Sequence, residues 1–179
     1  MACTSYTLKG MAQECKGSVA GLKKLYIGLI DDISGVTTTS AQTISAFTLK
    51  AGKKLYDYFV TEESSSLTST LTKNSQNGVK YYNNVINATF VKMTPEKHLE
   101  LQALANEKTF CIAVDNNGYS WFLGADSFVT ATEETAQSGQ SFDDLSGYQV
   151  VLTHRSGSLP YSIAENLYSS DIVVPTPTE

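Results

Sequence analysis

The stretch from Val79 to Lys92 constrains the fold more than any other part of the chain. It follows Asn77-Gly78, a dipeptide typical of hairpin turns because both positions tolerate a positive φ. One expected face carries Val79, Tyr81, Val85 and Val91, and the other carries Tyr82, Ile86, Ala88 and Phe90. Alternation with a period of two predicts a strand, and a strand of this length is expected to hold a bulge or bend. The pattern therefore predicts a β-hairpin whose second strand is unusually long.

Strand patterns recur through most of the chain. Strands are predicted at residues 25–30, 43–50, 55–61, 110–114, 119–124, 128–132 and 149–154. A turn at Ala51-Gly52 is expected to join residues 43–50 and 55–61 as a hairpin. Residues 31–35 are expected to break the first strand, and residues 133–140 to form a polar loop.

One helix is predicted at about residues 95–106. Thr94 suits the N-cap and Pro95 suits the first helical position. Leu101 and Leu104 then follow at helical spacing on one face. A single short helix among many strands predicts a mainly β fold, a β-sandwich or barrel with one flanking helix.

Residues 61–78 are the part of the chain whose structure is least determined by pattern. They are rich in Ser and Thr, and their large apolar residues before the turn are Leu67 and Leu71. Two interpretations are open: a flexible loop, or an exposed strand that pairs only when a neighbouring chain arrives. The threonine content slightly favours the exposed strand.

The chain is expected to form one domain. No linker or repeat divides it, and 179 residues suffice to bury a core. Residues 1–174 are assigned to a single β-rich domain that has an irregular N-terminal arm at residues 1–22 and an extended loop at residues 61–78. Residues 175–179 are expected to be a mobile C-terminal tail.

Composition and charge exclude several classes of function. Charged residues make up 17% of the chain and the net charge is −5, which argues against a surface that grips nucleic acid through clustered Lys and Arg. Cys3, Cys15 and Cys111 fit neither a disulfide framework nor a zinc site, and indicate reduced thiols made in a cytoplasm. No apolar run is long enough to span a bilayer, and the N-terminus lacks the pattern of a signal peptide.

Common catalytic and metal-binding motifs are absent from the sequence. It holds no phosphate-binding loop, His-Glu-x-x-His, paired Cys-x-x-Cys or Gly-x-Ser-x-Gly motif. Ser156-Gly157-Ser158 follows His154 but lacks a recognisable orienting acid. Asp143-Asp144 is more typical of a capped turn than of a calcium loop. The protein is therefore expected not to be an enzyme, and to need no cofactor or metal.

A monomeric β-sandwich that binds carbohydrate is the alternative function. Trp121 and nearby tyrosines would then form a stacking platform for a sugar. Aromatic residues at alternating strand positions are, however, more often core residues or cross-strand pairs.

Several short motifs, in order along the chain, resemble those of a known family. They are YTLKGMAQEC at 6–15, VAGLKKLYI at 19–27, Asn77-Gly78, DNNG at 115–118 with WFLG at 121–124, and GYQVVL at 147–152. Together they resemble virion proteins of tailed bacteriophages, particularly tail or neck proteins of phages that infect gut Bacteroidetes, crAss-like phages among them. The resemblance spans most of the chain and lies in the order and general character of these motifs.

This resemblance implies a tail-tube-like fold and a structural role. Such subunits form rings with copies of themselves, six-fold in a tail tube or twelve-fold in a neck, around a channel that DNA passes through without specific binding. The implied partners are further copies and other tail or neck proteins, with no membrane. The implied location is the virion, after synthesis in the cytoplasm of the bacterial host.

The segment expected to reach a neighbouring subunit is the Ser/Thr-rich stretch between residues 61 and 78. Strand addition at a sheet edge satisfies unpaired backbone groups, and interface cores are depleted in charge. The candidate assembly residues are Ser64, Ser66, Leu67, Thr70, Leu71 and Thr72.

Overall fold

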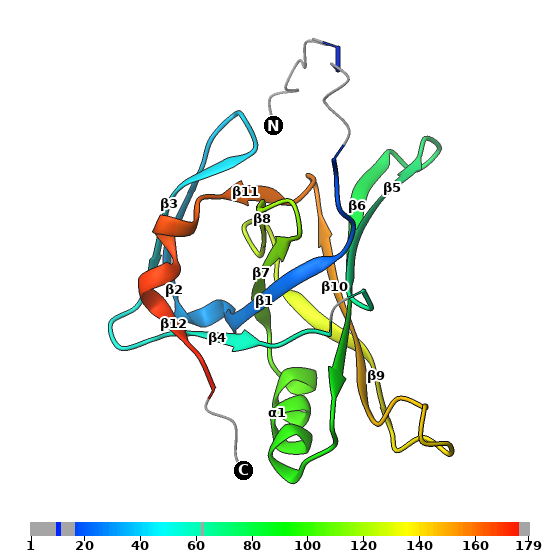
Figure 1. The fold of residues 1–179 in the computed structure, drawn as a ribbon. Helices are drawn as coiled ribbons and strands as arrows, with labels where there is room; N and C mark the ends of the chain where they lie inside the picture. Colours follow the sequence, from blue (N-terminus) through cyan, green and yellow to red (C-terminus); the bar gives the residue numbers. More distant parts are fainter. Residues whose placement is uncertain (1–9, 12–16, 62, 176–179) are drawn as a thin grey trace.

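A computed structural model describes residues 10–11, 17–61 and 63–175, which form strands, one α-helix and three short 3₁₀ helices (Figure 1). In chain order the elements are β1 (Leu22–Leu29), η1 (Ile30–Asp32), β2 (Ile33–Thr38), β3 (Thr43–Leu49), β4 (Leu55–Tyr58), β5 (Ser66–Asn74), β6 (Val79–Val91), α1 (Pro95–Asn106), β7 (Thr109–Asp115), β8 (Ser120–Leu123), β9 (Val129–Gln137), β10 (Gly147–Ser156), β11 (Tyr161–Ile163), η2 (Glu165–Leu167), η3 (Ser169–Asp171) and β12 (Ile172–Val173).

All the described strands belong to one hydrogen-bonded sheet of 12 strands, which turns back on itself to form two layers (Figure 1). Strands β9, β10, β6 and β5 pair in this order as an antiparallel layer, called the hairpin sheet below. Strands β2, β3, β11, β8, β7, β1, β4 and β12 pair in this order and curl round as the curled sheet. The two layers meet where Thr109 of β7 pairs with Val129 of β9.

Strands β1 and β7 separate two hydrophobic cores. The first core lies between the layers and takes Leu25 from β1 and Cys111 from β7. The second core fills the curled sheet and takes Tyr26 and Ile112 from the same two strands. Successive side chains of a strand point to opposite faces, so a strand between two cores must be apolar on both faces. The unbroken apolar run of β7 meets this requirement.

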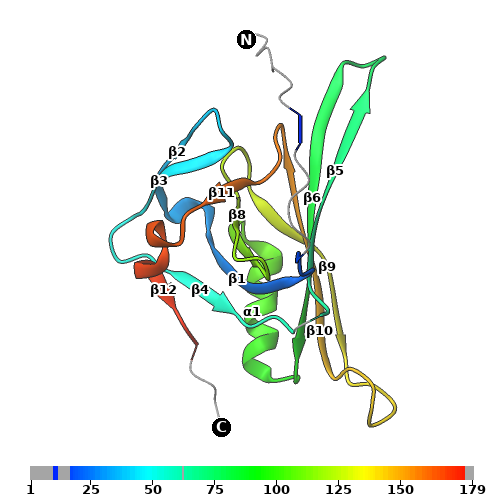
Figure 2. The same cartoon turned by 45° about the horizontal axis from the view of Figure 1, so that its top comes forward.

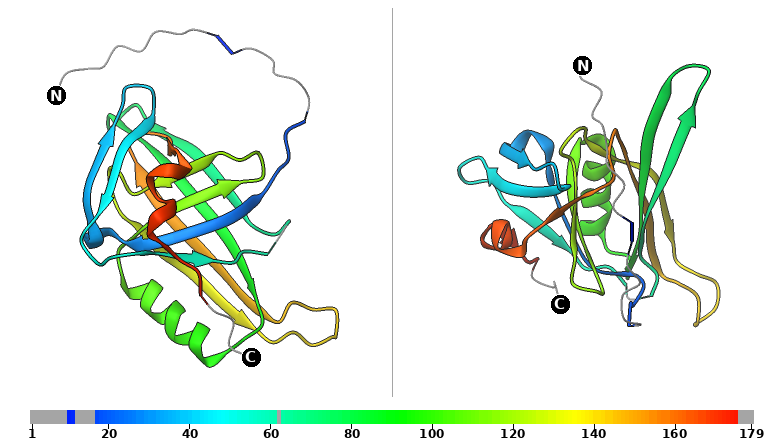
Figure 3. Two further views of the ribbon diagram at one scale, coloured as in Figure 1. Left: turned by 60° about the vertical axis from the view of Figure 1, so that its left-hand side comes forward. Right: turned by 90° about the horizontal axis from the view of Figure 1, so that it is seen from above.

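The predicted fold class is confirmed: the chain is mainly β, a β-sandwich with one flanking α-helix. The helix signals act as expected, since the Thr94 hydroxyl accepts a hydrogen bond from the backbone N–H of Lys97 at 3.4 Å. α1 lies at one end of the sandwich (Figure 3). Its Leu101 and Leu104 are buried in the first core, whereas Leu99 is 69% exposed.

The long strand is also confirmed, as β6. Ile86, Ala88 and Phe90 are buried on one face, as the alternation predicts. The expected bulge is absent from β6, because the strand pairs in unbroken register with both neighbours. Each neighbour pairs with only part of β6: β5 pairs with residues 79–87, and β10 pairs with residues 82–91.

The hairpin predicted for residues 43–50 and 55–61 is wrong, although the turn at Ala51-Gly52 is present. β3 pairs with β2 and β11, whereas β4 pairs with β1 and β12. Residues 31–35 do not simply break the chain; β2 begins at Ile33 and takes the place beside β3. Two register shifts between β2 and β3 blur the alternation, which hides this strand in the sequence.

The polar loop predicted at residues 133–140 is wrong for most of its length. β9 continues to Gln137 because it pairs with β10 as far as Gly147. The side chains from Glu133 onward are exposed, so the strand exists through backbone pairing rather than through burial.

Both ends of the described chain are held by side chains. Asn117 accepts a hydrogen bond from the N–H of Val19 at 2.8 Å and donates to its carbonyl at 2.9 Å. β1 begins at Leu22, so the last residue of the expected arm belongs to the strand. Residues 1–9 and 12–16 of that arm lie outside the described residues.

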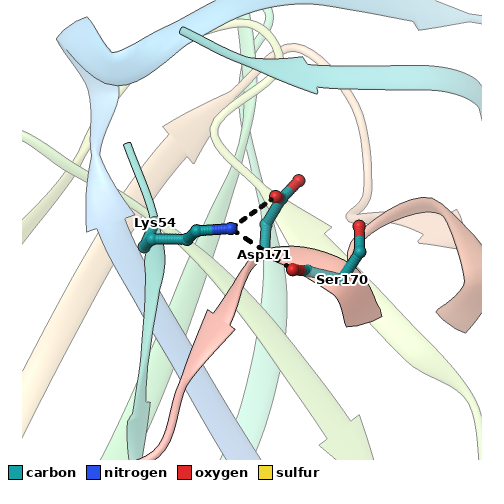
Figure 4. Close-up of polar contacts among 3 residues, drawn as sticks. All are labelled: Lys54, Ser170 and Asp171. Carbon is teal, nitrogen blue, oxygen red and sulfur yellow. Dashed lines mark hydrogen bonds and ion pairs between the residues drawn. The ribbon is translucent and has the colours of Figure 1, made fainter. Parts of the chain in front are cut away.

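Near the C-terminus, the Lys54 ammonium lies 3.1 Å from an Asp171 carboxylate oxygen and donates to the Ser170 carbonyl at 3.3 Å (Figure 4). Of the expected tail, residues 176–179 lie outside the described part of the chain.

Candidate assembly surface

The hairpin formed by β5 and β6 projects from the body of the molecule (Figure 2). β10 supports β6 only from Tyr82 onward, so residues 79–81 of β6 pair with residues 72–74 of β5 and have no third strand beside them among the described residues. A two-stranded ribbon is marginally stable in water by itself. The projecting end of this hairpin therefore has the geometry of a part that gains stability by contact with another surface.

The segment expected as an extended loop at residues 61–78 is corrected by this hairpin. Its middle part, Ser66–Asn74, forms β5, which pairs with β6 of the same chain along its whole length. The alternative, in which a strand forms only on arrival of a neighbouring chain, is also wrong, because β5 already pairs within its own chain. Asn77-Gly78 makes the expected turn, with Gly78 at a φ of 64°.

The candidate assembly residues do not all lie on one exposed surface. Thr70, Leu71 and Thr72 of β5 are exposed, and Leu71 is 48% exposed although its side chain is large and apolar. Leu67 is partly buried and packs against the first core. Ser64 lies before β5, where its hydroxyl donates to the Thr61 carbonyl at 3.1 Å.

Two of these positions therefore have local structural roles. Leu67 helps to attach β5 to the sandwich, and Ser64 shapes the turn before it. Ser66 begins β5 and is exposed. Four of the candidate assembly residues therefore have exposed side chains on β5 and could contact another subunit: Ser66, Thr70, Leu71 and Thr72.

The outer edge of β5 is open. β5 ends the order of paired strands, so half of its backbone N–H and C=O groups face away from β6, and no described strand pairs with them. Proteins protect such edges with Pro or with charged residues, above all Lys. The described β5 carries one charged side chain, Lys73, near the tip.

A second open edge, one without a paired strand, lies on the opposite side of the hairpin sheet, where α1 contacts β9. Among the described pairings β9 joins β7 only at Val129, so the edge of β9 that faces away from β10 has no strand beside it from Thr130 to Gln137. The sequence did not point to this edge, because residues 133–140 have the composition of a loop. The alternation of Val129 and Ala131, which contact the first core, was the available signal.

The two open edges carry opposite charge. The charged side chains of β5 and β6 are Lys73 and Lys80, which lie directly opposite each other in the register near the tip. Like charges at such a position are unfavourable in an isolated hairpin. The charged side chains of β9 are Glu133 and Glu134. Desolvation by neighbouring groups raises the pKa of the Glu134 carboxyl, although the side chain is exposed.

A serine–histidine catalytic arrangement is not assembled near β10. Asp126 of the β8–β9 loop accepts hydrogen bonds from Ser156 at 2.8 Å and Ser158 at 3.1 Å, so the acid that the sequence did not reveal contacts the serines. His154 lies in a different contact, with its Nδ1 3.2 Å from the Asn84 amide nitrogen. A serine that donates to a carboxylate is held in place, whereas a catalytic serine must donate to its base.

The other sequence candidates also have structural partners. The Trp121 indole N–H donates to Asp115 at 3.1 Å, and the Tyr119 ring lies 6.0 Å from the Trp121 ring at a tilt of 36°. Asp144 accepts from the N–H groups of Gln140 and Ser141, each at 2.8 Å, which fits the capped turn. These two backbone donors lower the pKa of the Asp144 carboxyl.

The described residues hold neither a metal-binding cluster nor a helix that could span a membrane. No group of three or more His, Cys, Asp or Glu side chains is placed to hold a metal ion within residues 10–11, 17–61 and 63–175. Within the same residues, α1 and the short 3₁₀ helices fall short of the length and apolar character needed to cross a bilayer.

Comparison with known proteins adds no family to this description. No protein-family model matches the chain, and a search of curated proteins finds no match.

Proposed function

We propose that this protein is a structural subunit of a bacteriophage virion that assembles with copies of itself into a ring or tube. The ring would form part of the tail or of the head–tail neck, and DNA would pass through its channel without specific binding. The partners are further copies of the chain and the neighbouring tail or neck proteins. The subunit would be made in the cytoplasm of the bacterial host.

The observation that carries the proposal is the pair of open edges on the hairpin sheet. Four antiparallel strands separate the edges, so β5 and β9 run in opposite directions. When two subunits are placed side by side in the same orientation, β5 of one meets β9 of the next as an antiparallel pair, the arrangement that strand addition requires. This contact joins two different surfaces, and a head-to-tail contact of that kind closes into a ring when its rotation allows.

The charges of the two edges match only when the subunits are offset along the strands. In the register of the hairpin sheet Glu133 lies level with Ser66, seven residues from Lys73, so Lys73 and Lys80 approach Glu133 and Glu134 only after such an offset. Charges at the rim of an interface mainly set orientation and the rate of encounter. The net charge of −5 fits a channel wall that DNA passes and does not adhere to.

The test is the state of assembly of the purified full-length chain. We expect closed rings or short tubes in negative-stain micrographs, and a mass above that of one subunit in light scattering after size exclusion. A species that stays monomeric at high concentration, with no rings under any condition, would rule the proposal out.

A matched pair of variants locates the contact. Thr70→Lys with Thr72→Lys places two lysines on the exposed part of β5, the device by which natural edges avoid pairing. Ala164→Lys with Asn166→Lys adds the same charge at exposed positions in and beside η2, on the curled sheet. We expect the β5 variant to remain monomeric and the control to assemble; assembly of both would remove β5 from the contact.

A further inference from the structure

A small cavity on the curled sheet is lined by polar groups that no part of the assembly proposal uses. Its volume is about 190 Å³, and its described lining comes from β1, the end of β7, the β7–β8 turn, β8 and the segment from η2 to Tyr168. Pockets for ligands commonly lie at the mouths of curled or closed sheets. The hairpin sheet contributes none of the lining residues that the structure describes, so this cavity is separate from the open edges.

The floor of the cavity consists of three buried hydroxyl groups. Tyr26, Ser120 and Tyr168 are 5%, 7% and 2% exposed. The Ser120 hydroxyl lies 2.8 Å from the Tyr168 hydroxyl, and the Tyr26 and Tyr168 rings lie 5.6 Å apart at a tilt of 53°. Each hydroxyl can both donate and accept, so the floor suits a ligand that also carries hydroxyl groups.

The walls carry both signs of charge. Lys24 and Glu165 are exposed side chains of the lining, and Lys23 and Asp115 also contribute to it. The Tyr26 hydroxyl beside the Lys24 ammonium raises the pKa of Lys24, so this side chain stays protonated near neutral pH. Two lysines and two carboxylates leave the lining without net charge, which disfavours a phosphate or another strong anion.

A buried carboxylate lies beside Tyr26, outside the residues that line the cavity. Asp57 lies directly opposite Tyr26 in the β1–β4 register, and is therefore on the same face of the sheet. It is 5% exposed, and one of its carboxylate oxygens has no hydrogen-bond partner. Buried polar atoms without partners are rare in proteins and indicate a ligand, a water or a protonated group.

We propose that this cavity binds one neutral sugar ring, held by hydrogen bonds from its hydroxyls to Tyr26, Ser120 and Tyr168 and to the walls at Lys24 and Glu165. The volume is below the roughly 300–1,000 Å³ of pockets for drug-sized ligands, so it admits a single ring. The proposal moves carbohydrate recognition away from Trp121, whose indole N–H is already bonded to Asp115.

Saturation-transfer NMR on the full-length protein tests this site with the methyl glycosides of glucose, mannose and galactose as separate probes. We expect transfer to at least one glycoside, at a dissociation constant on the order of millimolar for so small a ligand. Glycine and inorganic phosphate serve as charged competitors and are expected not to reduce the signal. Transfer to none of the glycosides, or displacement by glycine or phosphate, would overturn the proposal.

Two tyrosine variants distinguish the cavity from the aromatic pair Tyr119 and Trp121. Tyr168→Phe keeps the ring and removes the floor hydroxyl, whereas Tyr119→Phe makes the same change at an exposed position outside the lining. We expect the first to weaken binding roughly five- to tenfold, the effect of one lost hydrogen bond, and the second to leave it unchanged. Ser120→Ala replaces the first variant if Tyr168→Phe does not fold. Unchanged binding in the floor variant, or loss of binding in Trp121→Phe alone, would contradict the assignment.

Discussion

Leu71 offers a sharp test of the projecting hairpin, because it is large, apolar and 48% exposed in the isolated chain. Full burial of a leucine side chain contributes roughly 1.5–3 kcal/mol. About half of this is already realised in the subunit, so Leu71→Ser should lower the free energy of unfolding of the monomer by about 1 kcal/mol. If a neighbouring subunit covers the rest, each interface should lose about 1 kcal/mol as well, or roughly fivefold in affinity.

Leu99→Ser is the matched control. Leu99 lies on α1 and is 69% exposed, so the same chemical change occurs on a different surface. We expect it to cost about 0.5 kcal/mol of stability, mainly through helix propensity, and to leave association unchanged.

Two assays separate these effects. Urea denaturation at low protein concentration measures the stability of the subunit, and sedimentation velocity over a concentration series measures association. A loss of about 3 kcal/mol or more in the Leu71→Ser monomer would mean that Leu71 belongs to the core. Equal association of the two variants would mean that no subunit covers this part of β5.

Three other predictions concern the stability of the sandwich. Burial lowers the pKa of His154 below its ordinary value of 6.5, so the unfolded chain binds a proton at this side chain more readily than the folded chain does. The free energy of unfolding should therefore fall as the pH drops below about 6.5, by at most about 1.4 kcal/mol per pH unit. Urea titrations at several pH values should show that His154→Gln loses this part of the pH dependence. Gly147→Ala should destabilise the protein by several kcal/mol in thermal melts, or prevent folding, because the added Cβ would lie 2.0 Å from the Phe90 carbonyl oxygen; a wild-type melting temperature would refute the packing described for β10 and β6. Thr94→Ala should cost about 1 kcal/mol in urea denaturation by removing the N-cap bond to Lys97, and Thr94→Ser should restore most of it.

Features encoded by neighbouring residues could be predicted from the sequence. Thr94 and Pro95 define the start of α1 through local hydrogen bonding and backbone geometry, and the alternation from Val79 onward defines β6. Both signals are complete within a short segment, so no tertiary contact is needed to interpret them.

Features that depend on pairing between distant segments could not be predicted. β3 and β4 follow each other across a good turn, yet they do not pair: β3 pairs with β2 before it and with the distant β11, and β4 pairs with β1 and β12. β9 has a polar sequence from Glu133 onward and is a strand because β10 lies beside it. Strand formation depends on neighbours and burial more than on intrinsic preference, so composition was misleading there.

The candidate surfaces divide in the same way. The Ser and Thr content of residues 61–78 predicted a contact segment there, and β5 lies within these residues at one edge of the hairpin sheet. The opposite edge at β9 follows from the order of the strands. The cavity at Tyr26 and Tyr168 joins residues more than a hundred positions apart, for which the sequence holds no local signal.

Hydrogen exchange measured across a concentration series tests the central claim, that subunits join through β5 of one copy and β9 of the next. We predict that amides of β5 and of β9 from Thr130 to Gln137 become protected together as assembly proceeds, while those of the buried strands β1 and β7 change little. Protection that rises with concentration at other edges, such as β2 or β12, with β5 and β9 unchanged, would contradict the account.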